Sequence, residues 1–258
     1  MRRLILGMLG VAVASLATGC IYIEEEVGSG YPRTVTKELP PYDKISVRGA
    51  LGDVDIRTCD ECERIRVTAD DNLIDNIHAE VDDDTLELHV DGSIAPVTPI
   101  EIVVRTTVLR EVEVRGASDV VVQGELFDEL ELDISGASMV DVSGRVAELE
   151  AELSGSSTLV ARGLDLASID VDASGASDVT LAGTATRLSV ELSGSSDLEA
   201  TELLAQDVDI ESSGASDAMV CATETVEADL SGASSLHYTC EPTSVQVEAS
   251  GSSDAHSF

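Results

Sequence analysis

Residues 154–163, SGSSTLVARG, are followed twenty residues further on by SGASDVTLAG at 174–183. The pattern occurs eight times between residues 115 and 253, at spacings of 18 to 20 residues. A period near twenty that persists over so many units is typical of a solenoid, in which each unit stacks on its neighbours. The repeated glycines are Gly116, Gly136, Gly155, Gly175, Gly194, Gly214, Gly232 and Gly251.

Each unit alternates apolar and polar residues on both sides of its glycine. Ile169 and Val171 precede Gly175 with acidic residues between them, and Val179 and Leu181 follow it. Alternation with a period of two predicts strands that bury one face. Because glycine tolerates turns that other residues resist, we expect one corner at the repeated glycine. A second corner is expected where four units carry another glycine: Gly124, Gly144, Gly163 and Gly183.

These features predict an all-β fold, a single-stranded parallel β-helix with coils of 18–20 residues. Regular coils are expected over residues 111–258. Adjacent coils of such a helix lie about 4.8 Å apart, so eight coils would form a rod of roughly 40 Å. A right-handed turn is expected from the general chirality of parallel crossover connections.

A serine follows every repeated glycine at the second position. Small hydroxyls can close a tight corner by hydrogen bonding to nearby backbone groups. A nucleophilic role would need a histidine and a carboxylate beside the serine, and no such pair accompanies the repeat. We therefore interpret these residues as structural: Ser118, Ser138, Ser157, Ser177, Ser196, Ser216, Ser234 and Ser253.

Aspartates recur one position after these serines. Asp178, Asp197 and Asp217 fall on three consecutive units and would stack in one column. Like charges about 5 Å apart repel by roughly 1 kcal/mol or less in water. The column is expected to be a solvated acidic surface, and a weak calcium site is the alternative. No cofactor is expected.

The first twenty residues, MRRLILGMLGVAVASLATGC, combine two arginines, a short apolar run and a cysteine. This is the pattern of an export signal. Its end resembles the lipobox of bacterial lipoproteins, which implies a signal peptide at 1–19 and a lipid anchor on Cys20. Two or more acyl chains anchor a protein stably to a membrane. Ile21 after the cysteine resembles the outer-membrane sorting pattern, and an ordinary secretory signal is the alternative.

The segment before the repeat is less regular. Residues 20–41 are acidic and contain Gly, Ser and Pro, so a flexible tether is predicted. Residues 42–110 show strand-like alternation with irregular spacing. They predict irregular coils of the same β-structure with one inserted hairpin, and a separate small β-sandwich is the alternative.

Four cysteines remain if Cys20 carries lipid. Cys221 and Cys240 fall at nearly the same place on consecutive units, and Cys59 and Cys62 lie in CDEC. An exported protein is oxidised, and strands of neighbouring coils are close enough for a disulfide. We predict the bridges Cys221–Cys240 and Cys59–Cys62, with a zinc site as the alternative. Because no two histidines have metal-ligand spacing, surface positions are expected for His78, His89, His237 and His256.

The chain is strongly acidic. Its 258 residues include 15 Lys and Arg against 50 Asp and Glu, a net charge of −35. Such a charge excludes binding to nucleic acid through phosphate neutralisation.

Three features together are similar to one protein family. They are YDKISVRGALGDVDI at 42–56, DDNLIDNIHAEVDDDTLELHV at 70–90, and the SGAS and SGSS repeat. They resemble the bacterial head-GIN-domain family, whose members are also called autotransporter adhesins. The resemblance covers residues 42–258 and implies an exported or lipid-anchored β-helical protein. It supplies no catalytic residues.

The sequence favours a non-enzymatic cell-envelope lipoprotein that displays a β-helical interaction surface. Its partners would be the membrane, through Cys20, and a glycan or an envelope protein. The alternatives are a polysaccharide-active β-helix enzyme and a cation-binding acidic protein. An arginine beside two acids in a groove would favour the enzyme.

Overall fold

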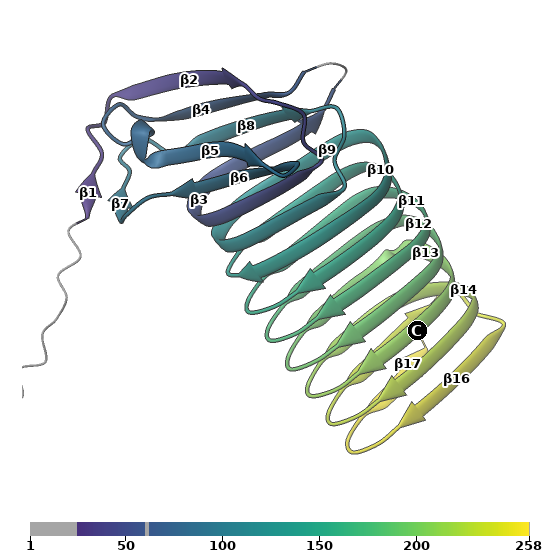
Figure 1. Cartoon of the computed structure of the whole chain (residues 1–258). Coiled ribbons are helices and arrows are strands. Elements are labelled where there is room, and N and C mark those ends of the chain that lie inside the picture. Colours follow the sequence, from purple (N-terminus) through teal and green to yellow (C-terminus); the bar gives the residue numbers. More distant parts are fainter. Residues whose placement is uncertain (1–24, 60–61, 258) are drawn as a thin grey trace, which may run out of the picture.

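The computed structural model describes residues 25–59 and 62–257 and consists of stacked β-coils (Figure 1). The predicted signal peptide and Cys20 lie outside these residues. Within the described ranges, no helix is long and apolar enough to cross a membrane. The all-β fold and the parallel solenoid are confirmed.

The regular part of the solenoid begins with β9 and continues to β17. Each strand pairs in parallel with its counterpart in the next coil, and equivalent repeat positions face each other. Asp178 of β12 pairs with Thr158 of β11 and with Asp197 of β13. The strands are β9 (Glu111–Gly136), β10 (Met139–Leu153), β11 (Thr158–Ala173), β12 (Asp178–Leu192), β13 (Asp197–Ser212), β14 (Asp217–Leu230), β15 (Ser235–Thr239), β16 (Ser244–Ala249) and β17 (Asp254–Ser257).

The core is a set of apolar columns inside the coils. Side chains such as Leu159, Val171 and Val179 are at most 1% exposed, as the alternation predicts. A further inward column between the two halves of the coil was not predicted. Its position shifts by one residue between units of 19 and 20 residues, which hides it from a fixed repeat alignment. Its members include Val146, Leu166, Ala185 and Ala205.

The corner at Gly175 shows why the repeat needs glycine and serine. Gly175 has φ +85°, and a Cβ added there would lie 2.5 Å from the carbonyl oxygen of Gly155 on the preceding coil. The amide of Ala176 donates to that same oxygen at 2.8 Å. The hydroxyl of Ser177, which is fully buried, donates to the carbonyl oxygen of Ser174 at 2.9 Å. Five equivalent serines make the same bond three residues back: Ser138, Ser157, Ser196, Ser216 and Ser234.

The less regular region extends the solenoid by two coils. β3 (Lys44–Thr58) is a complete coil that pairs in parallel with β9. Its other edge is covered by two separate strands, β6 (Thr85–Val90) on the first half and β8 (Glu101–Thr106) on the second. Because one hydrogen-bonded sheet continues from β9 through β3 to β8, the alternative of a separate β-sandwich is wrong.

Antiparallel strands cover the N-terminal end of the stack. β5 (Ile77–Asp82) pairs with β6 and forms the inserted hairpin, and β4 (Arg64–Asp70) pairs with β8. A 3-10 turn, η1 (Ile74–Asn76), connects β4 to β5. We call the stack of parallel coils from β9 to β17 the ladder. The antiparallel strands therefore cover the N-terminal side of the stack that leads into the ladder. We refer to β2 (Pro32–Glu38), β4, β5 and β8 as the N-terminal cap.

The predicted tether at 20–41 is wrong for much of its length. β2 (Pro32–Glu38) pairs antiparallel with β4 along its whole length, and β1 (Glu26–Val27) pairs with β7 (Ile94–Ala95). The reason lies in Thr34, Val35 and Thr36, because β-branched residues favour strands. This strand also covers an edge of β4 that would otherwise be open. Residues 20–24 lie outside the described part of the chain.

Candidate interaction site: an acidic groove along the solenoid

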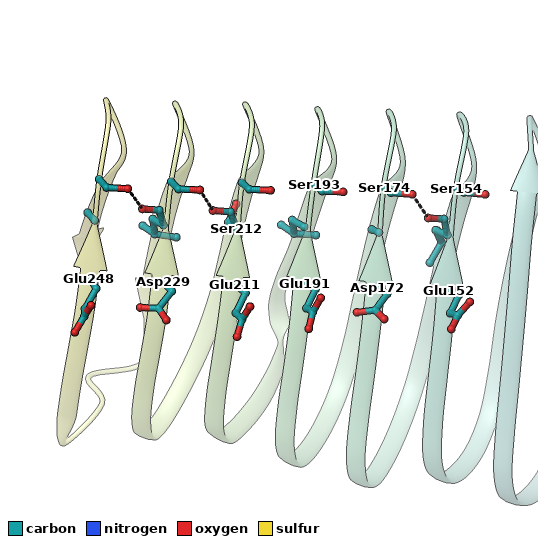
Figure 2. A pocket seen from close by; sticks show the side chains of 18 of the residues that line it. Glu152, Ser154, Asp172, Ser174, Glu191, Ser193, Glu211, Ser212, Asp229 and Glu248 are labelled. Carbon is teal, nitrogen blue, oxygen red and sulfur yellow. Dashed lines mark hydrogen bonds between the residues drawn. The ribbon is translucent and has the colours of Figure 1, made fainter.

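One face of the solenoid carries a long open groove of about 740 Å3 (Figure 2). It runs over the strand segments that lead into the glycine corners. The acidic column is the set of carboxylates three residues before each corner glycine from Gly136 onward, and the serine row is the set of serines one residue before each corner glycine from Gly155 onward. The acidic column is Asp133, Glu152, Asp172, Glu191, Glu211, Asp229 and Glu248, and the serine row is Ser154, Ser174, Ser193, Ser213, Ser231 and Ser250.

The alternation of the strands creates the acidic column. Residues two and four positions before each glycine point inward, so the residues between them point outward. Parallel pairing then places each carboxylate opposite the next, as for Asp172 with Glu191 and Glu191 with Glu211. The neighbouring charges of Asp172 and Glu211, with a smaller contribution from burial, raise the pKa of Glu191. Like charges are therefore held together by the fold.

The serine row also contacts the backbone. The hydroxyl of Ser174 donates to the carbonyl oxygen of Leu153 on the preceding coil at 3.1 Å. The hydroxyl of Ser250 reaches Leu230 in the same way at 3.4 Å. These hydroxyls donate to the preceding coil, whereas the buried serines described above donate within their own corner.

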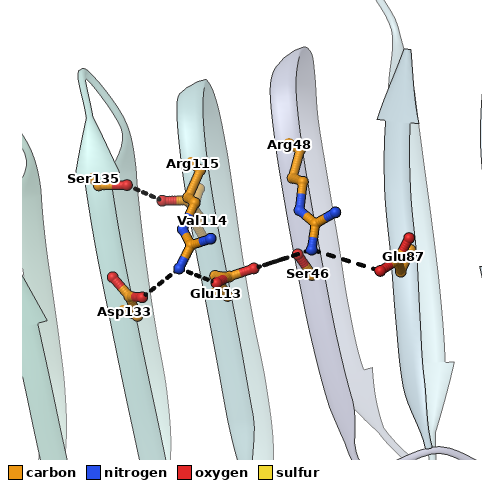
Figure 3. Close-up of polar contacts among 8 residues, drawn as sticks. All are labelled: Ser46, Arg48, Glu87, Glu113, Val114, Arg115, Asp133 and Ser135. Carbon is orange, nitrogen blue, oxygen red and sulfur yellow. Dashed lines mark hydrogen bonds and ion pairs between the residues drawn. The ribbon is translucent and has the colours of Figure 1, made fainter. Parts of the chain in front are cut away.

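Arginines neutralise the N-terminal end of the acidic column (Figure 3). Arg115 stands one residue before Gly116, where later coils have the serine row, and it bridges Glu113 and Asp133. Arg48 occupies the equivalent place on β3 and lies 3.5 Å from Glu87 and 3.7 Å from Glu113. Acids and arginines therefore alternate from β6 through β3 to both ends of the long strand β9.

Beyond Asp133 this neutralisation ends. Among the described residues, no ion pair reaches the six further carboxylates of the acidic column, from Glu152 to Glu248. Serine replaces arginine on each of these coils. The groove therefore offers a row of uncompensated negative charges beside hydroxyl groups.

The predicted calcium candidates lie on the other half of the coil. Asp178, Asp197 and Asp217 are exposed register partners, as expected. Asp217 accepts a hydrogen bond from Ser235. In the described ranges, however, no three His, Cys, Asp or Glu side chains are arranged to hold a metal ion. The calcium alternative has no support from the geometry.

Both predicted disulfides are present. Cys221 and Cys240 are bonded with their Cα atoms 5.2 Å apart, and Cys59 and Cys62 with theirs 6.2 Å apart. Cys221 pairs in register with Thr239, so Cys240 follows one residue later, at φ +70°. The zinc alternative is wrong, because the sulfur atoms bond within each pair.

The histidines were expected at surface positions, and the structure brings them into two pairs. His78 and His89 face each other across β5 and β6 with stacked rings, 5.1 Å between centroids, and His78 lies 3.0 Å from Asp91. His237 and His256 approach to 5.9 Å on β15 and β17. The first pair could have been found in the sequence, because a hairpin turn at Asp83 and Asp84 places His78 opposite His89.

Solved structures share this architecture. A crystal structure named "Putative lipid binding protein" from Parabacteroides distasonis superposes with a TM-score of 0.84 at 22% identity, covering 91% of this chain and 100% of that one. A "putative adhesin" from Parabacteroides merdae gives 0.83 at 19% identity, covering 91% and 99%. At these identities the similarity shows the fold alone. No curated protein sequence matches the chain.

A family comparison agrees with the resemblance in the repeat and the N-terminal region. The family described as "Putative auto-transporter adhesin, head GIN domain" matches residues 41–242, which include β3 to β15. This match covers most of the chain, and the chain belongs to that family.

Proposed function

We propose that this chain is a non-enzymatic cell-envelope lipoprotein that binds basic segments of other envelope proteins in the acidic groove. The observation that carries the proposal is the acidic column, in which six successive carboxylates lack an ion-pair partner among the described residues. Opposite charge along a groove concentrates a cationic partner and speeds its association.

The repeated chemistry of the groove supports binding over catalysis. Each coil offers nearly the same pair of groups, a carboxylate and a serine hydroxyl. General acid–base catalysis needs two carboxylates whose surroundings differ, so that one is protonated and the other ionised. A uniform row instead suits a partner that contacts several coils at once.

The groove is tested with a fluorescently labelled lysine-rich peptide and the full chain carrying Cys20→Ala, which bears no lipid. A groove variant combines Asp172→Asn, Glu191→Gln and Glu211→Gln. Its matched control combines Asp178→Asn, Asp197→Asn and Asp217→Asn on the other half of the coil. We expect the groove variant to bind about tenfold more weakly, because three modest charge contacts are lost.

Fluorescence anisotropy at low and high salt measures this difference. The control variant should keep most of the affinity, because its net charge changes equally but its groove is intact. Equal losses in the two variants would mean that the peptide responds to net charge alone, and the proposed groove would be wrong.

The membrane attachment is tested by Cys20→Ala in the native cell. We expect the variant to leave the membrane fraction, because the substitution removes the sulfur that would carry the lipid. A variant that remains entirely with membranes after detergent-free extraction would contradict the lipoprotein assignment and leave the groove proposal unaffected.

A second candidate is a polysaccharide-active enzyme, and one observation favours it. Arg115 lies beside both Glu113 and Asp133 at the end of the groove. Glu113 also accepts a hydrogen bond from Ser46 at 2.5 Å, so its carboxylate is held from several sides. Product release from acidic polysaccharides, abolished by Glu113→Gln and by Arg115→Gln, would establish this activity.

A further inference from the structure

The N-terminal cap and the adjacent strand β3 gather arginine side chains on one outward face. Arg57, Arg105 and Arg64 are register partners on the adjacent strands β3, β8 and β4. Val103 and Arg66 form the next pair in register on that face. Outward residues on neighbouring strands stand roughly 5 Å apart, so these guanidinium groups share one patch.

Two of these arginines have no carboxylate partner. Arg57 pairs with Asp55, and Arg64 lies 3.4 Å from Glu38. Arg66 and Arg105 form no ion pair with any described residue. The patch therefore carries uncompensated positive charge in a protein with a net charge of −35.

A hollow of about 250 Å3 lies within the patch. Its walls are Thr36, Arg64, Arg66, Val103 and Arg105. This volume is below the roughly 300–1,000 Å3 of sites for drug-sized ligands, so the hollow suits a small group. Its polar lining is three guanidinium groups and one hydroxyl, all hydrogen-bond donors.

From these observations we propose that Arg64, Arg66 and Arg105, with Thr36, form a binding site for a phosphate group. Guanidinium forks match the oxygen geometry of phosphate and bind it through two parallel hydrogen bonds. An anion in the hollow would also relieve the repulsion between the stacked arginines. The same phosphate chemistry could come from a lipid headgroup or from a soluble phosphorylated compound.

The distribution of charge separates this patch from an ordinary solvated face. Residues 116–258 contain three arginines and no lysine against 28 acidic residues. The arginines of the cap, in contrast, cluster on adjacent strands without a matching number of acids facing them. The site does not depend on the acidic groove, which lies on the other half of the coil.

The test uses the full chain carrying Cys20→Ala, with NMR signals of the arginine Nε–H groups as the readout. Titration with inorganic pyrophosphate should shift the signals of Arg64, Arg66 and Arg105 and saturate. A patch variant, Arg66→Gln with Arg105→Gln, should bind at least tenfold more weakly. The matched control, Arg145→Gln with Arg187→Gln, removes two exposed arginines of the ladder and should change the affinity less than twofold.

Vesicle sedimentation distinguishes the two sources of phosphate. Vesicles of phosphatidylglycerol are compared with vesicles of phosphatidylcholine, for the same three chains. Patch-dependent binding to pyrophosphate identifies a soluble phosphate compound, and patch-dependent sedimentation without pyrophosphate binding identifies a lipid headgroup. If no arginine signal saturates and no sedimentation depends on the patch, or if the control loses as much binding as the patch variant, the proposal is overturned.

Discussion

At the corners of the repeated glycines, two small residues have different roles. Gly175 lets the backbone take a positive φ and approach the preceding coil, and Ser177 closes the turn with its buried hydroxyl. Neither residue can take part in catalysis or binding at the surface, because glycine has no side chain and the Ser177 hydroxyl is buried. The repeat therefore preserves backbone geometry, and the exposed positions are free to carry charge.

Gly175→Val should lower the free energy of unfolding by about 3 kcal/mol, because a β-branched residue meets both a positive φ and a carbonyl oxygen 2.5 Å from its Cβ. Gly163→Val is the matched control, since Gly163 has φ +72° but no neighbour within 4 Å of an added Cβ. Chemical denaturation measures both variants. Equal losses would show that close approach between corners contributes nothing.

At the scale of whole strands, the last coils depend on a covalent link. β16 and β17 pair with β14 and β15 on one side, and most of their residues are exposed. The disulfide between Cys221 and Cys240 ties β14 to the chain between β15 and β16. It therefore limits the fraying of the part of the stack with the fewest contacts.

Cys240→Ser should destabilise the C-terminal coils by about 3 kcal/mol, because the bridge closes a loop of intermediate length. Hydrogen exchange should increase over residues 235–257 and stay unchanged in β9 to β12. Cys62→Ser should have a smaller effect, since Cys59–Cys62 closes a very short loop. Uniform acceleration of exchange along the whole rod would contradict this local role.

The strands that repeat were predictable, and the contacts that break the repeat were not. Alternation around Gly175 defined which residues of β11 and β12 are buried, because a strand has only two faces. The strand β2 was not predicted, because its sequence PRTVTKE is short and exposed along its whole length. Such a segment shows no alternation of buried and exposed residues that would distinguish it from a linker. The sequence places Arg48 and Arg115 each one residue before a glycine. That both arginines contact Glu113 was not predictable, because this contact requires β3 to lie beside β9 in the sheet.

At the scale of the whole molecule, the regular coils and the N-terminal cap respond to protons in opposite directions. The neighbouring charges of Asp172 and Glu211 raise the pKa of Glu191 in the ladder. In the cap, burial alone would raise the pKa of Asp70, but hydrogen bonds from Thr98, Val97 and Gly30 lower it overall. Mild acid therefore favours the ladder, and stronger acid disfavours the cap.

Lowering the pH from 7 to about 5 should increase the free energy of unfolding. A carboxyl whose pKa is raised on folding binds its proton more tightly in the native state, so stability rises as the pH falls through that raised pKa. Asp70 acts oppositely: its contribution is present above the ordinary carboxyl pKa near 4 and is lost as the pH falls through its lowered pKa. Hydrogen exchange below about pH 4 should therefore show the cap opening before the ladder. Opening in the reverse order would contradict this assignment.

Sodium chloride should also stabilise the ladder, because the screening length falls to about 3 Å at 1 M salt. Calcium at matched ionic strength should give the same gain in melting temperature, since no three candidate ligands converge among the described residues. A larger gain with calcium would reveal a specific site on the acidic surface.

The stacked corners also determine how such a protein can change over evolution. Each coil touches only the coils before and after it, so the fold has no fixed number of repeats. A tandem duplication of residues 155–193 would add two coils, with their alternating lengths intact, between a corner at Gly155 and one at Gly194. The rod would grow by about 10 Å and its groove would gain two carboxylates, while the cap and the terminal disulfide stayed as they are. The number of repeats therefore determines both the length of the rod and the charge of its groove, and a single duplication changes both.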